Sequence, residues 1–252
     1  MTLSFNELVL KFQELGVVEG DTILVHSSYK SFGEVEGGPQ TVIDSLKHIL
    51  TDEGTLIVPT FNYDFCDGVD YDIKKTPSKM GIISEMVRND SKSKRTQDPV
   101  FSFAVMGKHR DYLTNLKYHH SFGADSIFAK LRELDAKIII IGLAYNESVT
   151  FFHHIEEIQG CDYRFFKKFS GKITDIDGNV RDDEIVLFVR DIDRGVQNDV
   201  DKMGEILEKE GIVKKKIIGK SEIKLMKANQ VYQRTTLELK KNPHILIKIQ
   251  SE

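Results

Sequence analysis

Apolar and polar positions in the first quarter of the chain follow two different periods. The segment 4–16 begins with a capping-box sequence and continues with apolar side chains at helical spacing, which predicts a helix ending at a glycine. Short apolar runs at 21–26 and 55–59 predict buried strands, and the segment 41–50 between them has helical periodicity. Because a glycine-containing loop joins the first strand to this helix, the order predicts a β-α-β unit.

The middle of the chain continues this alternation of helices and strands. Residues 61–76 are rich in Asp, Tyr, Asn and Gly without a clean period, which indicates a long loop of the kind that carries functional residues. A helix is predicted to open at 77–81, followed by a strand at 101–106 and a helix at 126–134. The run 137–143 is the most apolar in the sequence, and its β-branched residues predict a buried strand of a parallel sheet.

The last third of the chain has a different pattern. Alternation around an Asp-Gly pair in 172–180 predicts a hairpin, and the segment lacks the acidic ladder of a calcium-binding loop. Helices are predicted at 199–211 and 222–239, with a basic strand at 213–219 between them. The segment 245–249 is predicted to pair as an edge strand.

Together these elements predict a single α/β domain over residues 1–252. It has a mostly parallel central sheet with flanking helices, and residues 165–252 form a less recognisable C-terminal subregion that is antiparallel, β-rich and partly helical. A length of 252 residues with 40% hydrophobic side chains is sufficient for one globular core.

Composition narrows the class of protein. The net charge of −4, from 35 basic and 39 acidic residues, argues against a nucleic-acid-binding protein. We expect no membrane span and no signal peptide, because no apolar run is long enough and the N-terminus lacks the required layout. The two cysteines, Cys66 and Cys161, have no metal-type spacing and are expected to be free thiols. These features predict a cytoplasmic protein.

The segment 150–157 has the densest group of side chains that can act in catalysis, two histidines and two glutamates. It follows the apolar strand predicted at 137–143 after a short connection. In open α/β sheets ligands bind beyond the carboxyl ends of the strands. If the segment is helical, His153 shares a face with Glu156 and with Glu157. A carboxylate beside an imidazole is what a general base requires. A solvated helix face with ordinary charges fits the same pattern, so the segment alone leaves both interpretations open.

Other common motifs are absent from the sequence. It contains no dinucleotide-binding or P-loop glycine pattern and no nucleophile elbow. The adjacent histidine pairs at 119–120 and 153–154 point in diverging directions, so we expect no metal site. The segment 26–28 at a strand end, with the glycines at 37–38 soon after, fits either an anion-binding turn or a routine turn between strand and helix.

The chain contains a set of short segments in a characteristic order: 15–17, 20–22, 24–28, 37–42, 54–56, 59–61, 76–81, 95–102, 122–123 and 150–156. In this order they resemble the aminoglycoside 3-N-acetyltransferase family, also called the antibiotic N-acetyltransferase fold. The resemblance covers roughly the first two thirds of the chain, and the last third has no matching motif.

This resemblance implies direct acyl transfer from acetyl-coenzyme A, or another acyl-coenzyme A, to an amine of an amino sugar, without a metal. The match to the family's catalytic histidine is His153, with Glu156 as the carboxylate that orients it. The resemblance also implies a coenzyme A site formed by His26, Ser27, Ser28, Gly38, Pro39, Thr60, Ser78, Met80, Gly81, Phe122 and Gly123.

One departure concerns the acceptor. Asp98 stands where the family commonly has a histidine that faces the acceptor. The residues expected to contact the acceptor are Asp98, Ser102, Asp64, His154 and Glu157. The residues at His154 and at 151–152 are also unusual for the family. Together with the last third, which has no matching motif, these departures favour a nucleotide-linked amino sugar of surface polysaccharide (for example lipopolysaccharide) biosynthesis as the acceptor. Arg164, Lys167 and Lys168 are candidates for a diphosphate contact, although a solvated basic surface fits them as well. An aminoglycoside, as in antibiotic resistance, is the alternative, and an inactive coenzyme A-binding protein is a third. The oligomeric state, for example whether the protein is a homodimer, does not follow from the sequence.

Overall fold

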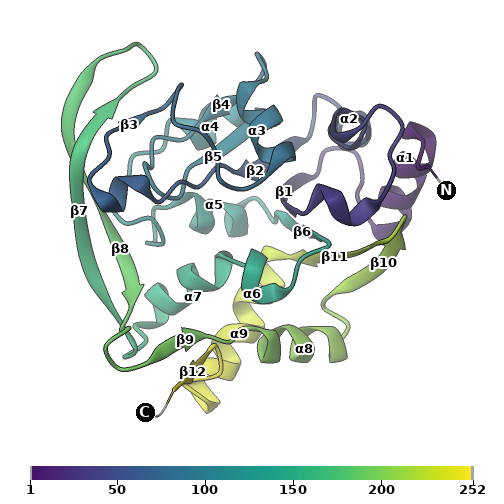
Figure 1. The fold of residues 1–252 in the computed structure, drawn as a ribbon. Coiled ribbons are helices and arrows are strands. Elements are labelled where there is room, and N and C mark those ends of the chain that lie inside the picture. The colour runs from purple at the N-terminus through teal and green to yellow at the C-terminus, as the bar shows by residue number, and fades with distance from the viewer. Residues whose placement is uncertain (1, 251–252) are drawn as a thin grey trace.

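The computed structural model describes residues 2–250, and its main sheet has seven strands within that range (Figure 1). In spatial order these strands are β10 (Lys214–Ile218), β11 (Ser221–Lys227), β6 (Lys137–Ile141), β1 (Thr22–Ser27), β2 (Thr55–Pro59), β5 (Phe103–Gly107) and β4 (Lys94–Arg95). At the centre β1 pairs in parallel with both β2 and β6, and the strands on either side are antiparallel. The predicted α/β class is therefore confirmed, and so is the β-α-β unit of β1, α2 (Pro39–Leu50) and β2.

Alternating residues of the central strands divide the core into two layers. Ile138 and Ile140 of β6 face one layer, whereas Ile139 and Ile141 face the other, and all four are fully buried. A strand covered on both faces reads as a continuous apolar run, which is why this segment stood out in the sequence.

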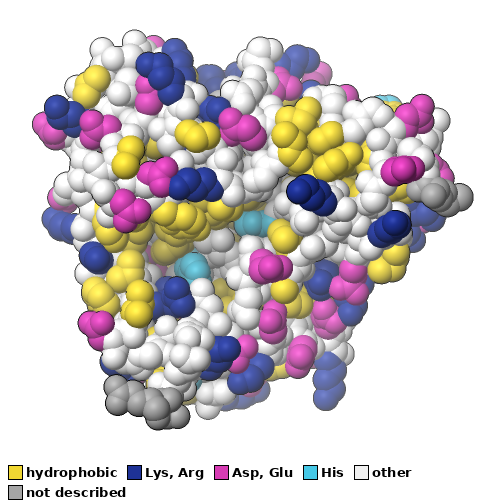
Figure 2. All heavy atoms as spheres, viewed as in Figure 1, with side chains coloured by type: hydrophobic (Ala, Val, Ile, Leu, Met, Phe, Trp, Pro, Cys, Tyr) yellow, Lys and Arg dark blue, Asp and Glu magenta, His cyan; other side chains and the backbone are white. Residues whose placement is uncertain are grey.

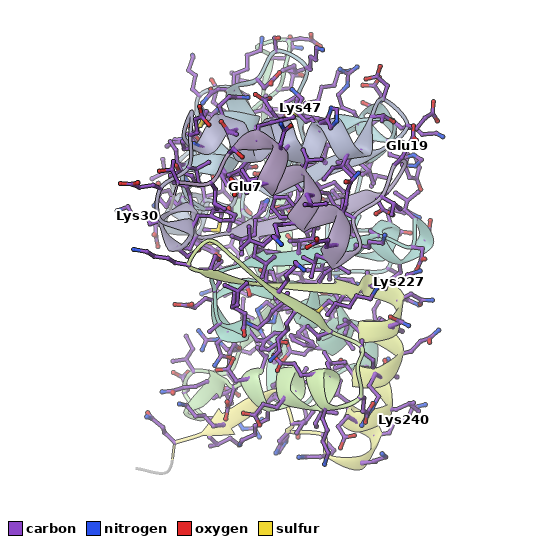
Figure 3. All side chains as sticks on the ribbon, turned by 90° about the vertical axis from the view of Figure 1, so that its right-hand side faces the viewer. Glu7, Glu19, Lys30, Lys47, Lys227 and Lys240 are labelled. Atoms are coloured by element: carbon purple, nitrogen blue, oxygen red, sulfur yellow. The ribbon has the colours of Figure 1, made fainter. Side chains whose placement is uncertain are left out.

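Helices cover both faces of the sheet. One face packs against α1 (Phe5–Leu15), α2 and α3 (Ile82–Asn89), and the other against α5 (Ile127–Glu133), α7 (Phe151–Gln159) and α9 (Ala228–Lys241). Ser4 and Glu7 form the predicted capping box at the start of α1. From the side, α1 lies next to the β10–β11 edge (Figure 3), and Glu14 of α1 pairs with Lys216 of β10 at 2.8 Å.

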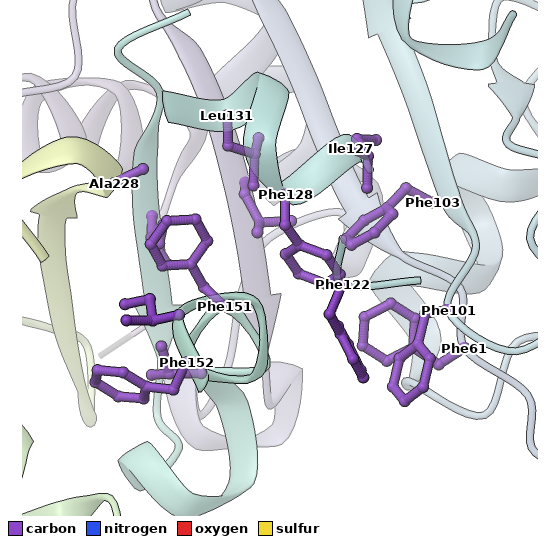
Figure 4. Packing of buried hydrophobic residues seen from close by; sticks show 14 of the residues in the cluster. Phe61, Phe101, Phe103, Phe122, Ile127, Phe128, Leu131, Phe151, Phe152 and Ala228 are labelled. Atoms are coloured by element: carbon purple, nitrogen blue, oxygen red, sulfur yellow. The ribbon is translucent and has the colours of Figure 1, made fainter. Parts of the chain in front are cut away.

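The layer that Ile138 and Ile140 face is rich in aromatic rings (Figure 4). The ring centroids of Phe101 and Phe122 are 4.7 Å apart, and those of Phe103 and Phe128 are 5.2 Å apart. Fully buried aromatic side chains contribute about 1.5–3 kcal/mol each through removal from water. This cluster supports the floor of the site described below.

The C-terminal third adds a long hairpin and a small sheet. The hairpin pairs β7 (Arg164–Thr174) with β8 (Val180–Arg190) around the predicted Asp-Gly turn, and it projects at the left of Figure 1. Its first strand also pairs with β3 (Tyr71–Asp72), and β9 (Val196–Asn198) pairs with β12 (Ile247–Ile249) as predicted for the tail. The remaining helices are α4 (Arg110–Thr114), α6 (Tyr145–Ser148) and α8 (Asp201–Lys209), with short 3-10 turns at Tyr29–Phe32 and Asp64–Asp67.

The prediction of one helix over 222–239 is wrong in its first part. Residues Ser221–Lys227 form β11, and α9 begins only at Ala228. Ile223 and Leu225 alternate with Lys224 and Met226, and the strand gains antiparallel pairing with β6. Pairing to an existing sheet outweighs a local helical tendency. Within residues 2–250 no helix combines the length and the hydropathy needed to cross a bilayer.

Candidate active site

The chain leaves β6 through a turn that only glycine can occupy. Gly142 has φ +62, and a Cβ atom there would lie 2.0 Å from Ser31 Oγ. The chain then forms α6 and α7 beyond the carboxyl end of the parallel strands, where open α/β sheets bind ligands. The segment 150–157 therefore lies where the sequence predicted a site.

Two residues on one face of α7 form a closely paired base and carboxylate. His153 Nδ1 lies 2.6 Å from Glu156 Oε2, and the Glu156 side chain is 1% exposed. An ionised carboxylate can only accept, so the ring proton is assigned to Nδ1 and the lone pair to Nε2. This tautomer is the one that a general base needs.

Arg164, at the start of β7, closes the arrangement from the other side. Its Nε lies 2.8 Å from Glu156 Oε2. Its Nη2 lies 3.0 Å from His153 Nδ1, but the two nitrogens do not hydrogen-bond in this tautomer because both carry hydrogen. The guanidinium is held in place because Nη2 donates to Asn198 Oδ1 at 2.9 Å and Nη1 donates to the Phe188 carbonyl at 3.2 Å. A buried carboxylate thus has a buried cation as its partner.

These contacts decide the protonation states. Burial lowers the pKa of His153, and Arg164 lowers it further, against the opposing effect of Glu156. Burial alone would raise the pKa of Glu156, but the charges of Arg164 and His153 together bring it below its ordinary value. At neutral pH the site therefore holds a neutral imidazole beside an ionised carboxylate.

His153 opens onto a cleft of about 630 Å³. Figure 2 shows hydrophobic side chains and histidine gathered in a hollow in the middle of this face. The aromatic residues that line the cleft are Tyr63, Phe101, Phe122, Tyr145, Phe165, Phe169 and Phe188. Its charged lining residues are Glu147, Arg164, Lys167, Arg190 and Asp193. Cleft size and lining suit a small organic molecule.

The residues predicted to bind coenzyme A lie at strand ends and helix starts. His26, Ser27 and Ser28 are at the carboxyl end of β1, and Thr60 directly follows β2. Gly38 and Pro39 begin α2, and Ser78, Met80 and Gly81 precede α3. Phe122 and Gly123 lie in the loop against α7, where the Phe122 ring contacts the ring of His153 edge to face at 5.4 Å between centroids.

Two features of this group suit a ligand that brings polar atoms. His26 is 5% exposed, and its Nε2 has no hydrogen-bond partner among residues 2–250. Gly81 has φ +95, and a Cβ there would lie 3.8 Å from the Ser27 carbonyl, so two of the predicted segments meet. Thr60 differs, because it is fully buried and bonded to Ser102. The coenzyme A role of all these residues stays a prediction.

Two of the residues predicted to contact the acceptor, His154 and Ser102, are buried in the protein core instead. His154 is fully buried, its Nδ1 bonds the Phe122 carbonyl at 2.7 Å, and its ring lies near Tyr232 of α9. It faces away from the cleft because adjacent residues diverge by about 100° on a helix. Ser102 is also fully buried, between Thr60 and Arg95.

The departure at Asp98 has a structural explanation. Its buried carboxylate accepts from the backbone N–H groups of Val100 and Phe101 at 2.8 and 2.7 Å and from Ser121 Oγ at 2.6 Å. Asp98 therefore holds a turn and the 119–123 loop rather than lining the cleft at His153. Asp64 pairs with Lys79, and Glu157 with His120, and neither lines this cleft.

Sequence reasoning missed the roles of Arg164 and Asn198. Both follow the last matching segment, 150–156, and Arg164 was considered only as a diphosphate contact. Their role depends on the hairpin and β9 folding against α7, which no local pattern reveals. Within residues 2–250 no cluster of three or more His, Cys, Asp or Glu side chains is arranged to hold a metal ion.

Comparison with known proteins assigns the family. The family model described as aminoglycoside 3-N-acetyltransferase matches residues 24–240. The YokD protein of Bacillus subtilis, described as aminoglycoside N(3')-acetyltransferase-like, is 30% identical over 166 residues, which is 57% of this chain and 60% of that protein. Aminoglycoside N(3)-acetyltransferase VII of Streptomyces paromomycinus is 28% identical over 184 residues, 65% of this chain and 63% of that protein. The matches thus span about six-tenths of these relatives.

Solved structures agree on the fold. AAC-IIIb bound to CoASH superposes with a TM-score of 0.84 at 19% identity, covering 96% of this chain and 97% of that one. The sisomicin-bound AAC-VIa superposes with a TM-score of 0.84 at 20% identity, covering 96% of this chain and 99% of that one. With most of its length matched by the family model, the chain belongs to the aminoglycoside 3-N-acetyltransferase family.

Proposed function

We propose that this protein is an acyl-coenzyme A-dependent N-acetyltransferase that acetylates an amine of an amino sugar. The observation that carries the proposal is the pairing of His153 Nδ1 with the buried Glu156 carboxylate, which leaves Nε2 as the proton acceptor at the cleft. Membership of the family and the superposition on a coenzyme A-bound relative support the same activity.

The reaction follows from this arrangement. The acceptor amine attacks the thioester carbonyl carbon, and His153 Nε2 takes a proton from the nitrogen as the C–N bond forms. Collapse of the tetrahedral intermediate breaks the C–S bond and releases coenzyme A, whose thiolate then takes the proton from the imidazolium. Glu156 stabilises the imidazolium while it exists, and it keeps the ring oriented throughout.

A covalent acyl-enzyme on cysteine is not needed. Cys66 lines the cleft, but burial raises the pKa of its thiol to about 11. At neutral pH it is therefore a thiol rather than the nucleophilic thiolate.

For the acceptor, the comparisons favour an aminoglycoside over the nucleotide-linked sugar that the sequence favoured. The matched relatives are described as aminoglycoside acetyltransferases, and a structural relative binds sisomicin. A nucleotide-linked amino sugar remains a second candidate because of one observation. The basic residues that line the cleft are Arg164, Lys167 and Arg190, against two acidic ones, Glu147 and Asp193. Polycationic aminoglycosides are better matched by carboxylates.

An acceptor screen tests the proposal. Release of coenzyme A thiol from acetyl-coenzyme A is measured with kanamycin, gentamicin and sisomicin, and separately with UDP- and dTDP-linked amino sugars. Turnover with the aminoglycosides supports the leading acceptor, and turnover with only the nucleotide sugars supports the second. Coenzyme A binding without thiol release from any amine contradicts the enzyme assignment and leaves an inactive coenzyme A-binding protein.

A further inference from the structure

Two arginines face each other across the β7–β8 hairpin. Arg164 and Arg190 are directly paired in the antiparallel register. Like charges in this position destabilise a sheet. The charge of Arg164 is balanced by Glu156 at 2.8 Å. Arg190 has no such partner, because within residues 2–250 no carboxylate lies within 4.0 Å of its guanidinium and its side chain makes no hydrogen bond.

The position of Arg190 makes this lack of a partner notable. Its half-buried side chain lines the cleft that contains His153. Burial lowers the pKa of Arg190 and the neighbouring Arg164 lowers it further, with only a weaker opposing effect of Glu156. An arginine nevertheless stays protonated, so the cleft contains a charge that the protein itself does not neutralise.

The surroundings do not neutralise it either. Lys167 adds a second cation to the cleft lining. Of the two acidic lining residues, Glu147 caps α6 by accepting from the Ala144 N–H at 3.0 Å, and Asp193 is exposed. Aromatic rings make up much of the remaining wall of the cleft, among them Phe165 and Phe188. A partly desolvated cation with planar donors beside apolar walls is suited to bind a phosphate or carboxylate.

We propose that Arg190 forms an anion subsite of the cleft, which binds a phosphate group of one substrate beside the base His153. This inference rests on the proposed function, because the anion is taken to belong to a substrate of acetyl transfer. Binding of an anion to the subsite can nevertheless be tested without turnover. The anion has two possible sources: the acceptor, if it is nucleotide-linked, or the acyl-coenzyme A.

The test uses inorganic pyrophosphate as a probe of the subsite. Its affinity is measured by calorimetry and by the rise in melting temperature, with the wild type, Arg190→Gln and Arg181→Gln. Arg181 is a matched control because it lies on the same strand, loses the same charge and does not line this cleft. We expect Arg190→Gln to weaken pyrophosphate binding about 10- to 100-fold, as loss of a charge-assisted contact does, and Arg181→Gln to leave it within about twofold.

Repeating the measurement with saturating coenzyme A distinguishes the sources. Pyrophosphate binding that persists and still depends on Arg190 assigns the anion to the acceptor. Binding that disappears, together with weaker coenzyme A affinity of Arg190→Gln, assigns it to the acyl donor. Equal pyrophosphate affinity in the wild type and Arg190→Gln, or no binding to the wild type, overturns the proposal. If coenzyme A fails to bind, the proposed function fails, while the first measurement still reports on Arg190.

Discussion

Replacing Arg164 by methionine tests the most informative contact in the site. The change keeps a long side chain but removes the guanidinium that lies 2.8 Å from the Glu156 carboxylate. Both side chains are almost completely buried, at 4% and 1% exposure, so solvent does not replace the lost partner. Removing one member of a buried ion pair costs about 3–5 kcal/mol of unfolding free energy. For a chain of this size that corresponds to a fall in Tm of about 6–20 °C.

The same variant changes the pH dependence of activity in a defined direction. Arg164 helps to lower the pKa of His153, whereas Glu156 raises it. Without Arg164 the pKa of His153 rises, so more of the base is protonated at neutral pH. Since the base acts in its neutral form, activity falls as pH drops through this pKa, and the acidic limb of kcat/KM moves to higher pH. Activity lost at pH 7 is then partly regained at alkaline pH.

The assay is thiol release over a range of pH, with the same acceptor for both proteins. The acceptor amine titrates identically in each, so the difference between the profiles reports on the enzyme. Arg181→Met, which removes a surface pair with Asp183, serves as the control and is expected to change stability by less than about 1 kcal/mol. Adding Glu156→Gln to Arg164→Met should restore most of the lost stability, because a neutral amide needs no counter-charge. An unshifted acidic limb and an unchanged Tm in Arg164→Met would refute this reasoning.

Two further predictions concern residues that were expected to act in the site or that line it. Cys66→Ala should retain turnover within about threefold in steady-state kinetics, because the half-buried thiol has a raised pKa and is not expected to be the nucleophile. Loss of activity by a hundredfold would argue for an acyl-enzyme. Asp98→Ala should lower stability by about 1–3 kcal/mol in urea unfolding, because three donors lose their acceptor, with KM for the acceptor unchanged. A large rise in that KM without a stability change would place Asp98 in the acceptor site after all.

The sequence was most informative where structure depends on near neighbours. The Ile-rich strand β6 reads as a buried parallel strand because both faces are covered. His153 and Glu156 meet because three residues separate them on one helix, so their pairing follows from spacing alone. The capping box at Ser4 and the Asp-Gly turn of the hairpin were equally local.

Features that depend on distant partners were missed or misassigned. Arg164 is eleven residues after His153 in the sequence but lies on another element, β7. It reaches the site only because the hairpin folds against α7. Asp98 and Ser102 look like binding residues by type, yet burial and internal hydrogen bonds occupy them. His154 had to face away from the cleft once His153 faced it, which is a consequence of helical geometry. How coenzyme A and the acceptor contact the chain stays a prediction.

The central claim is that His153 is the general base of acetyl transfer, and His153→Asn tests it most directly. Asparagine keeps a polar side chain of similar reach but cannot accept a proton at neutral pH. We expect thiol release at saturating acetyl-coenzyme A to fall by about 10²–10⁴-fold. Calorimetry should show coenzyme A affinity within about twofold of the wild type. Near-normal turnover in a folded His153→Asn protein would contradict the assignment.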